Sequence, residues 1–91
     1  MVSNNTEIEN IVIEIVNSLR DGKKKKVTHE DIDKNLFGTE LMSEAYEIAG
    51  VYCEIEKEFN IKIKESVFEQ YGFNTVSDIC AIVETSKKSN P

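Results

Sequence analysis

Apolar residues near the start of the chain recur at the three- and four-residue spacing of an amphipathic helix. The residues of this stripe are Ile8, Ile11, Val12, Ile15 and Leu19. Thr6 and Glu9 fit a capping box, in which each side chain accepts the backbone amide hydrogen of the other residue. Asp21-Gly22 follows the stripe, and glycine accepts the left-handed backbone at a helix C-terminus. The pattern predicts a first helix that begins at Thr6 and ends at Asp21-Gly22.

The next segment has few apolar residues and predicts a long linking loop. Val27 returns to the core, and Thr28 can cap a short turn through Asp31. We expect Ile32 and Leu36 to anchor the loop in the core and Gly38 to act as its pivot.

Helical spacing returns in a second segment, which begins between Thr39 and Glu44 and runs to Phe59. Its inner stripe is Ile48, Tyr52, Ile55 and Phe59, extended backward by Leu41 and Ala45 if the helix starts early. Asn60 is the expected C-terminal stop. Gly50 lies inside this helix, where glycine costs up to ~1 kcal/mol relative to alanine. It permits close approach by another helix or by a partner, and the sequence leaves both readings open.

The rest of the chain predicts two further helices. Residues 61–63 alternate like a strand but are too few for a sheet, so we expect an extended connector. A short third helix follows Ser66 and ends at Gly72, and Thr75 caps a last helix. Residues 85–91 predict a flexible polar tail. The whole chain, residues 1–91, is expected to be one all-α domain: a four-helix bundle with three longer helices, a short third helix and a core over about residues 6–84.

Charge narrows the classes of partner. The chain has 17 acidic and 11 basic residues, a formal net charge of −6. This disfavours nucleic acid, whose phosphates need a basic face, and favours partner enzymes with basic patches. The run Lys23–Lys26 is expected to be a solvated loop. No apolar run approaches the ~20 residues that span a bilayer, and the N-terminus lacks the pattern of a secretion signal, so we expect no membrane partner and a cytoplasmic location.

The candidates for catalytic chemistry are few. Cys53 and Cys80 lie in apolar helical patterns, which predicts buried, reduced thiols. Residues 29–33 (His-Glu-Asp-Ile-Asp) form the one cluster that resembles a metal or acid–base site, but a transition-metal site usually needs several imidazole or thiolate ligands. The sequence therefore predicts a protein that is not an enzyme. It also predicts a monomer, because no apolar stripe is left over once four helices have packed, with Tyr46 and Val51 as the two residues that this packing does not clearly use.

Three segments, in this order, resemble the acyl and peptidyl carrier proteins. Residues 54–63 (EIEKEFNIKI) are similar to the end of that family's second helix, and residues 74–79 (NTVSDI) to the start of its last helix. Residues 27–38 are similar to the family's approach to its modified serine. The resemblance implies the four-helix carrier fold over about residues 6–84. A divergent branch from bacterial peptide-maturation clusters lacks the usual serine motif, and this chain resembles that branch.

The position that carries phosphopantetheine in the family is altered in this chain. The family has Asp-Ser-Leu at the start of its second helix, and the ungapped register places Ala45 on the serine, within Glu44-Ala45-Tyr46. Alanine has no hydroxyl to esterify, so no cofactor is expected. The alternative is a working carrier with phosphopantetheine on Ser43, which needs a two-residue shift that turns a helical side chain by about 200°. We expect Ser43 instead to cap the second helix.

The second helix is also the family's recognition surface for basic patches on partner enzymes. Five glutamates lie along one side of it, with Val51 among them: Glu40, Glu44, Glu47, Glu54 and Glu58. In the family register Glu44, Glu47 and Glu56 keep the acidic character, while Gly50 and Lys57 replace acidic residues. The predicted docking residues are Glu44, Glu47, Val51, Glu54 and Glu56, and the bland alternative is a solvated helix face. The leading hypothesis is thus a non-catalytic docking partner in a biosynthetic or peptide-maturation pathway.

Overall fold

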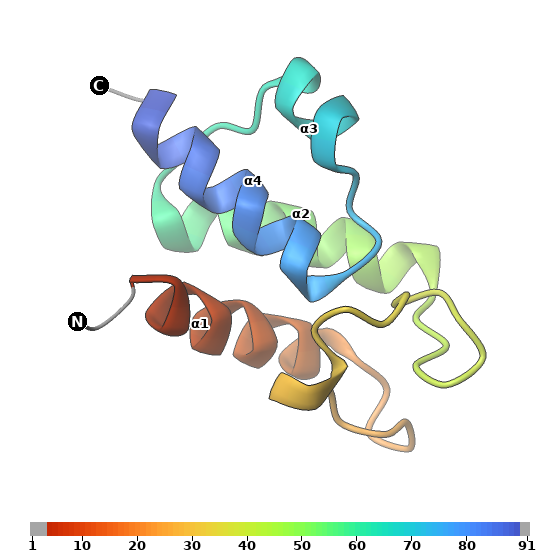
Figure 1. Cartoon of the computed structure of the whole chain (residues 1–91). Helices are drawn as coiled ribbons and strands as arrows, with labels where there is room; N and C mark the ends of the chain where they lie inside the picture. Colours follow the sequence, from red (N-terminus) through yellow and green to blue (C-terminus); the bar gives the residue numbers. More distant parts are fainter. Residues whose placement is uncertain (1–3, 90–91) are drawn as a thin grey trace.

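A computed structural model describes the backbone of residues 4–89 and the side chains of residues 7–88. It contains the helices α1 (Asn4–Leu19), α2 (Ala45–Phe59), α3 (Glu65–Tyr71) and α4 (Val76–Ser89), and one turn of 3-10 helix, η1 (His29–Asp31) (Figure 1). No strand occurs in residues 4–89. The predicted all-α bundle of three longer helices and a short third helix is confirmed. None of the described helices is long and apolar enough to cross a membrane.

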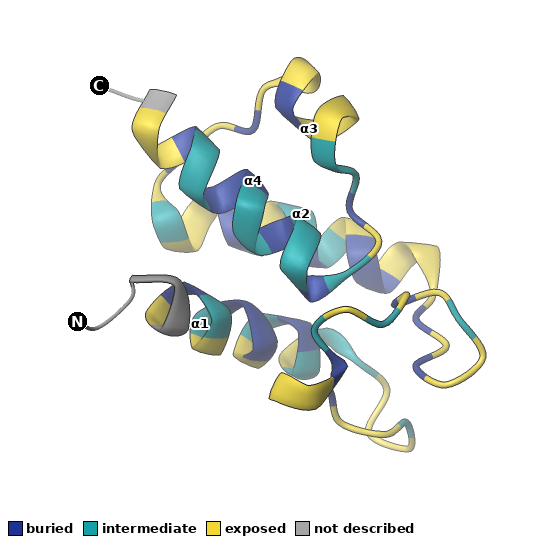
Figure 2. Ribbon diagram, viewed as in Figure 1, coloured by how far each residue is buried: buried dark blue, intermediate teal, exposed yellow. Residues whose placement is uncertain are grey.

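The three long helices share one core. α1 packs against both α2 and α4, and α3 packs mainly against α4 (Figure 1). Their inward faces are buried and their outward faces are exposed or half-buried (Figure 2). The largest side chains in this core with no exposure are Leu36, Leu41, Ile55, Ile79 and Ile82. Burial of each such side chain contributes about 1.5–3 kcal/mol to the free energy of unfolding, so this shared core is a large stabilising contribution to the bundle.

Gly50 of α2 lies against α1. A β-carbon at this position would lie 3.3 Å from Cδ1 of Leu19, closer than ordinary van der Waals contact. The missing side chain therefore lets the C-terminal end of α1 approach α2. Of the two readings that the sequence left open, close approach by another helix is the one that the fold uses.

Local capping signals predict most of the helix ends correctly. The backbone N–H of Asp78 donates to Oγ1 of Thr75 at 2.9 Å, which caps α4 as expected. Asn60 ends α2 with a left-handed backbone, at a φ of 54°, and Gly72 ends α3 at a φ of 75°. Residues 61–63 form the predicted extended connector. At η1, the Asp31 carboxylate accepts the backbone N–H of Thr28 at 3.0 Å, so that turn is also confirmed.

Predicted boundaries in all four helices differ from the structure. α1 ends at Leu19, before the predicted Asp21-Gly22, and α3 begins at Glu65 rather than after Ser66. α1 begins at Asn4 rather than Thr6, whose side chain lies outside the described residues. α2 begins at Ala45, just after the predicted window. α4 continues to Ser89, so the prediction of a flexible tail from Thr85 is wrong for residues 85–89. The reason is that Ser86 lies on the same face of α4 as the apolar residues one turn earlier and is itself buried, so the inward stripe continues through a polar residue.

Candidate functional site

Ala45, the residue that the resemblance aligns with a modified serine, is the first residue of α2 and is exposed. Glu44 precedes it as the N-cap, with an extended backbone. The position is thus on the surface at the start of the helix. It presents only a methyl group there.

Ser43 is buried and does not cap α2. The residue is 7% exposed, and its hydroxyl accepts a hydrogen bond from Nη1 of Arg20 at 2.8 Å. Nη2 of Arg20 also donates to the carbonyl oxygen of Leu41 at 2.6 Å. Met42, between them, has a left-handed backbone with a φ of 51°. The predicted cap is therefore wrong: the side chain of Ser43 faces the end of α1, and Glu44 takes the capping position.

Glu47 is buried rather than available for docking. It is 3% exposed, and its carboxylate accepts the backbone N–H of Glu44 at 2.8 Å and of Asp21 at 3.1 Å. The ammonium of Lys24 pairs with the same carboxylate at 3.1 Å. Burial alone would raise the pKa of Glu47, but these donors outweigh it and hold the pKa below its usual value. Lys24 is half-buried, so the lysine run is not wholly the solvated loop that its charge predicts.

The other predicted docking residues do not form one surface. Val51 is buried in the core, and Glu56 is half-buried with its carboxylate accepting the backbone N–H of Ile63 at 2.9 Å. Glu44 is exposed with the ammonium of Lys24 3.9 Å away, and Glu54 is half-exposed with Lys57 3.5 Å away. The physical reason is that α2 packs on two sides, because the side with Glu47 and Gly50 meets α1 while Ile48 and Ile55 enter the core.

The exposed residues of α2 are Ala45, Tyr46, Ala49 and Cys53, followed in the last turn by the charged residues Lys57 and Glu58. Tyr46 is 72% exposed. The predicted burial of Cys53 is therefore wrong. Cys80 is half-buried, and its pKa is raised to about 12, mainly by burial and also by Glu9 and Glu84. The spacing of four residues from Ala45 to Ala49 to Cys53 was a sequence signal for this row.

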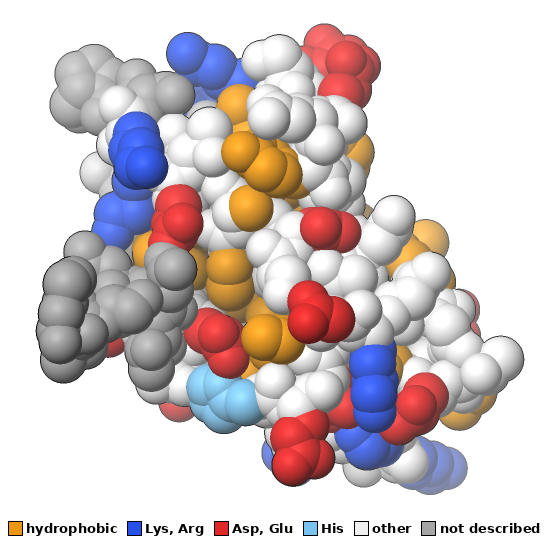
Figure 3. Space-filling model, viewed as in Figure 1, with side chains coloured by type: hydrophobic (Ala, Val, Ile, Leu, Met, Phe, Trp, Pro, Cys, Tyr) orange, Lys and Arg blue, Asp and Glu red, His pale blue; other side chains and the backbone are white. Residues whose placement is uncertain are grey.

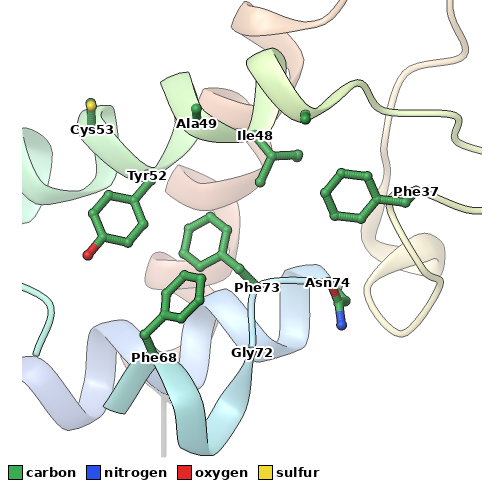
Figure 4. A pocket seen from close by; sticks show the side chains of 10 residues that line it. Phe37, Ile48, Ala49, Tyr52, Cys53, Phe68, Gly72, Phe73 and Asn74 are labelled. Atoms are coloured by element: carbon green, nitrogen blue, oxygen red, sulfur yellow. The ribbon is translucent and has the colours of Figure 1, made fainter. Parts of the chain in front are cut away.

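An apolar groove borders this exposed row. Its volume is about 670 Å³, and it lies between α2, α3 and the loop before α2 (Figure 4). Its walls include Phe37 of the loop, Ala49 and Cys53 of α2, Phe68 of α3 and Phe73 after it. Phe37 and Phe68 are 45% and 37% exposed. The sequence analysis did not predict this groove, because residues from three separate segments form it.

Three aromatic rings form one wall of the groove. The ring centroids of Tyr52 and Phe68 are 5.7 Å apart, those of Tyr52 and Phe73 are 5.6 Å apart, and those of Phe68 and Phe73 are 5.8 Å apart. Figure 4 shows these rings grouped at one end and Phe37 at the other. Aromatic pairs at such distances stabilise one another beyond the area that they bury, so this wall is largely preformed.

The His29–Asp33 cluster serves the fold. Lys25 and Lys34 pair with the carboxylate of Asp31 at 2.6 and 2.9 Å, and with Thr28 they hold its pKa well below the usual range. Nδ1 of His29 contacts the carboxylate of Glu9. No group of three or more potential metal ligands occurs among the residues whose side chains are described.

A second, smaller cavity of about 220 Å³ lies between α1, α4 and the loop after η1, and Glu9, Cys80 and Glu84 are among its walls. The smaller cavity is more polar than the α2–α3 groove, which is therefore the strongest candidate site.

The described side chains show no single large apolar face in the view of Figure 3. Hydrophobic side chains reach this face in separate patches, with acidic side chains between them.

Comparison with protein-family models, curated proteins and solved structures finds no match to this chain. The resemblance to carrier proteins therefore stands on the three sequence segments and on the order of the helices.

Proposed function

We propose that this chain is a non-catalytic docking domain with a carrier-protein-like fold, which binds a partner enzyme in a biosynthetic or peptide-maturation pathway. The observation that supports this most is the apolar groove beside the exposed row of α2. Exposed aromatic residues such as Tyr46 and Phe37 are typical of protein interfaces, where they contribute large contact area at low entropic cost.

Charge supports the same proposal. α2 contains four glutamates and one lysine, and α3 contains two glutamates and no basic residue. Glu47 is buried and paired with Lys24, so the exposed and half-buried side chains of these two helices comprise five glutamates and one lysine, which is four net negative charges. A partner with a basic patch would be attracted to this side of the molecule, and its association should weaken as salt is added.

A non-catalytic role fits the start of α2. Ala45 presents a methyl group where the family resemblance expects a nucleophilic hydroxyl. Ser43, the nearest serine to it in the sequence, is buried, and its hydroxyl accepts a hydrogen bond from Arg20. In this proposal the domain contributes a binding surface, and the chemistry belongs to the partner.

The proposal is tested by photo-crosslinking in the native host. Tyr46 is replaced by p-benzoylphenylalanine in one version of the protein, and Glu14, which is exposed on α1, is replaced in a matched control. After irradiation, we expect one defined protein to be joined through position 46 and not through position 14. Crosslinks that are absent at both positions, or the same at both, would contradict a docking role for this surface.

The alternative function is a carrier with phosphopantetheine on Ser43. It needs this hydroxyl to leave Arg20 and reach a transferase, which the buried position opposes. The intact mass of the protein, purified from its host or after co-expression with a broad-specificity phosphopantetheinyl transferase, tests this. We expect the unmodified mass in both cases. An added phosphopantetheine mapped to Ser43 would replace the docking proposal with the carrier function.

A further inference from the structure

We propose that the groove between α2 and α3 binds the apolar face of a basic amphipathic helix from the partner protein. This inference rests on the proposed docking function and specifies the chemistry of its partner. The groove volume of about 670 Å³ lies within the range of pockets that bind ligands of modest size, ~300–1,000 Å³. It can therefore hold a few large side chains rather than a folded domain.

The dimensions of the groove wall suit a helix. The exposed row of α2 runs from Ala45 to Cys53, which is about 12 Å along the helix axis at ~1.5 Å per residue. An amphipathic partner helix presents anchors over about two turns, at positions i, i+3 or i+4 and i+7, which is a similar length. Small side chains at Ala45 and Ala49 leave room for its backbone. Phe37 and the aromatic wall would then contact the anchors from both ends.

The rim of the groove selects a basic partner. Glu44 lies at the N-terminal end of the exposed row and is exposed, and α3 carries Glu65 and Glu69 on its exposed surface. Lys57, the one basic residue of α2, has its ammonium near the carboxylate of Glu54. The lysine run lies instead between α1 and η1, where Lys24 and Lys25 pair with Glu47 and Asp31. The ammonium of Lys24 also lies 3.9 Å from the carboxylate of Glu44, which is largely exposed, so among the described side chains α3 presents the carboxylates of the rim that have no lysine pair. Lysine or arginine residues flanking the apolar face of the partner helix would meet these carboxylates.

The same charges disfavour two other occupants. A second copy of this chain would bring two acidic α2–α3 surfaces together, and like charges across an interface oppose association. A fatty acid would bring its own carboxylate to the acidic rim, and it would leave Tyr46, which is exposed outside the groove lining, uncovered. A basic amphipathic helix would cover the apolar wall with its apolar face and would place its basic residues near the carboxylates of the rim.

The absence of tryptophan from the chain allows a direct test. The probe is a synthetic leucine–lysine amphipathic helix of about 18 residues, above the length at which isolated helices are marginal, with one tryptophan at the centre of its apolar face. Its fluorescence reports burial without background from the protein. We expect a blue shift on binding, weaker affinity at high salt, and no binding by a matched peptide with glutamate in place of lysine.

Two variants locate the binding site. Ala49→Gln fills the mouth of the groove with a polar side chain and should weaken the affinity for the probe by about tenfold, which corresponds to ~1.4 kcal/mol. Ala81→Gln places the same change on α4, beside the smaller cavity, and should bind as the unchanged protein does. Circular dichroism confirms that both variants fold. Equal affinity of the Ala49→Gln variant and the unchanged protein would overturn the proposal.

The unchanged protein provides a second readout. The exposed Cys53 lies in the groove wall, and the half-buried Cys80 does not. We expect the probe to slow alkylation of Cys53 and to leave that of Cys80 unchanged. Three outcomes would assign the groove to another occupant and overturn the proposal. The first is binding of the glutamate peptide, and the second is displacement of the probe by dodecanoate at equal concentration. The third is a dimer in sedimentation equilibrium that Ala49→Gln abolishes.

This test is independent of the crosslinking test. If a partner crosslinks through position 46 but the probe does not bind in the groove, the docking function stands and the basic-helix inference fails. If no partner crosslinks, the docking function itself fails, whatever the probe does.

Discussion

Lys24 and Glu47 form an ion pair of 3.1 Å that joins the loop after α1 to the first turn of α2. The carboxylate of Glu47 also accepts two backbone amides, and Nζ of Lys24 also donates to the carbonyl oxygen of Met42 at 2.7 Å. The pair thus orders the entry to the helix that forms one wall of the groove.

Replacement of Glu47 should destabilise the fold. Glu47→Gln keeps one acceptor but removes the charge that pairs with Lys24, and hydrogen bonds to buried charged groups contribute about 1.5–3 kcal/mol each. We expect the free energy of unfolding in urea to fall by roughly that amount. Glu54→Gln, at a half-exposed position of the same helix, should change it by less than about 0.5 kcal/mol. Equal losses in the two variants would show that the Lys24–Glu47 pair has no special role.

Stability should also depend on acid pH. The pKa of Asp31 is lowered, first by Lys25 and then by Lys34, and the pKa of Glu47 is lowered by its backbone donors and Lys24 against the cost of burial. A group whose pKa is lower in the folded state stabilises the fold above its unfolded pKa, near 4 for these carboxyls, and loses this contribution as the pH falls through the folded value.

Unfolding midpoints measured from pH 7 to pH 2 should therefore be level above about pH 5 and fall below it. Asp31→Asn should lower the midpoint at pH 7 and flatten the decline. A variant that declines as steeply as the unchanged protein would contradict this role for Asp31.

Gly50 offers a test of helix packing in which two effects oppose each other. Gly50→Ala gains up to ~1 kcal/mol of helix propensity. Its β-carbon would meet only the two terminal methyls of Leu19, at 3.3 and 3.8 Å, and this half-buried side chain can move by a few tenths of an ångström. We expect a net gain in the free energy of unfolding. Gly50→Val should instead destabilise, because its added methyls have no space against α1. Thermal unfolding of both variants decides this, and a stabilising valine would show that α1 is not tightly packed there.

The register of the carrier resemblance can be tested by restoration of the family motif. The triple substitution Glu44→Asp, Ala45→Ser and Tyr46→Leu places Asp-Ser-Leu on the exposed start of α2. After co-expression with a broad-specificity phosphopantetheinyl transferase, we expect this variant to gain phosphopantetheine at position 45 and the unchanged protein to gain none. Intact mass and peptide mapping provide the measurement. An unmodified variant that is folded would argue against the register.

Signals that act within a few residues predicted the fold well. Thr75, Asn60 and Gly72 mark helix ends in the structure as the sequence indicates, because a cap depends on its immediate neighbours. The inner stripe of α2 was right at Ile48 and Ile55, since helical spacing places them on the core side.

The candidate site was harder to predict because it depends on distant partners. Two of the three donors that make burial of Glu47 possible come from Lys24 and Asp21, 23 and 26 residues earlier in the chain, so local charge patterning placed this glutamate on the surface. Ser43 was misread for the same reason, since its partner is Arg20 on the far side of the loop. The groove joins three segments, and no single segment shows its apolar walls.

The four lysines after α1 are identical in sequence but have different positions in the fold. Lys24 and Lys25 are fixed by Glu47 and Asp31, which lie in different elements, while Lys23 and Lys26 are exposed on either side of them. Deletion of any one lysine yields the same shortened sequence, in which the connection from α1 to η1 is one residue shorter and the two paired lysines change their register relative to Glu47 and Asp31. The run therefore acts as a spacer of defined length, and we expect substitutions at its ends to be tolerated far better than a change in the number of its residues.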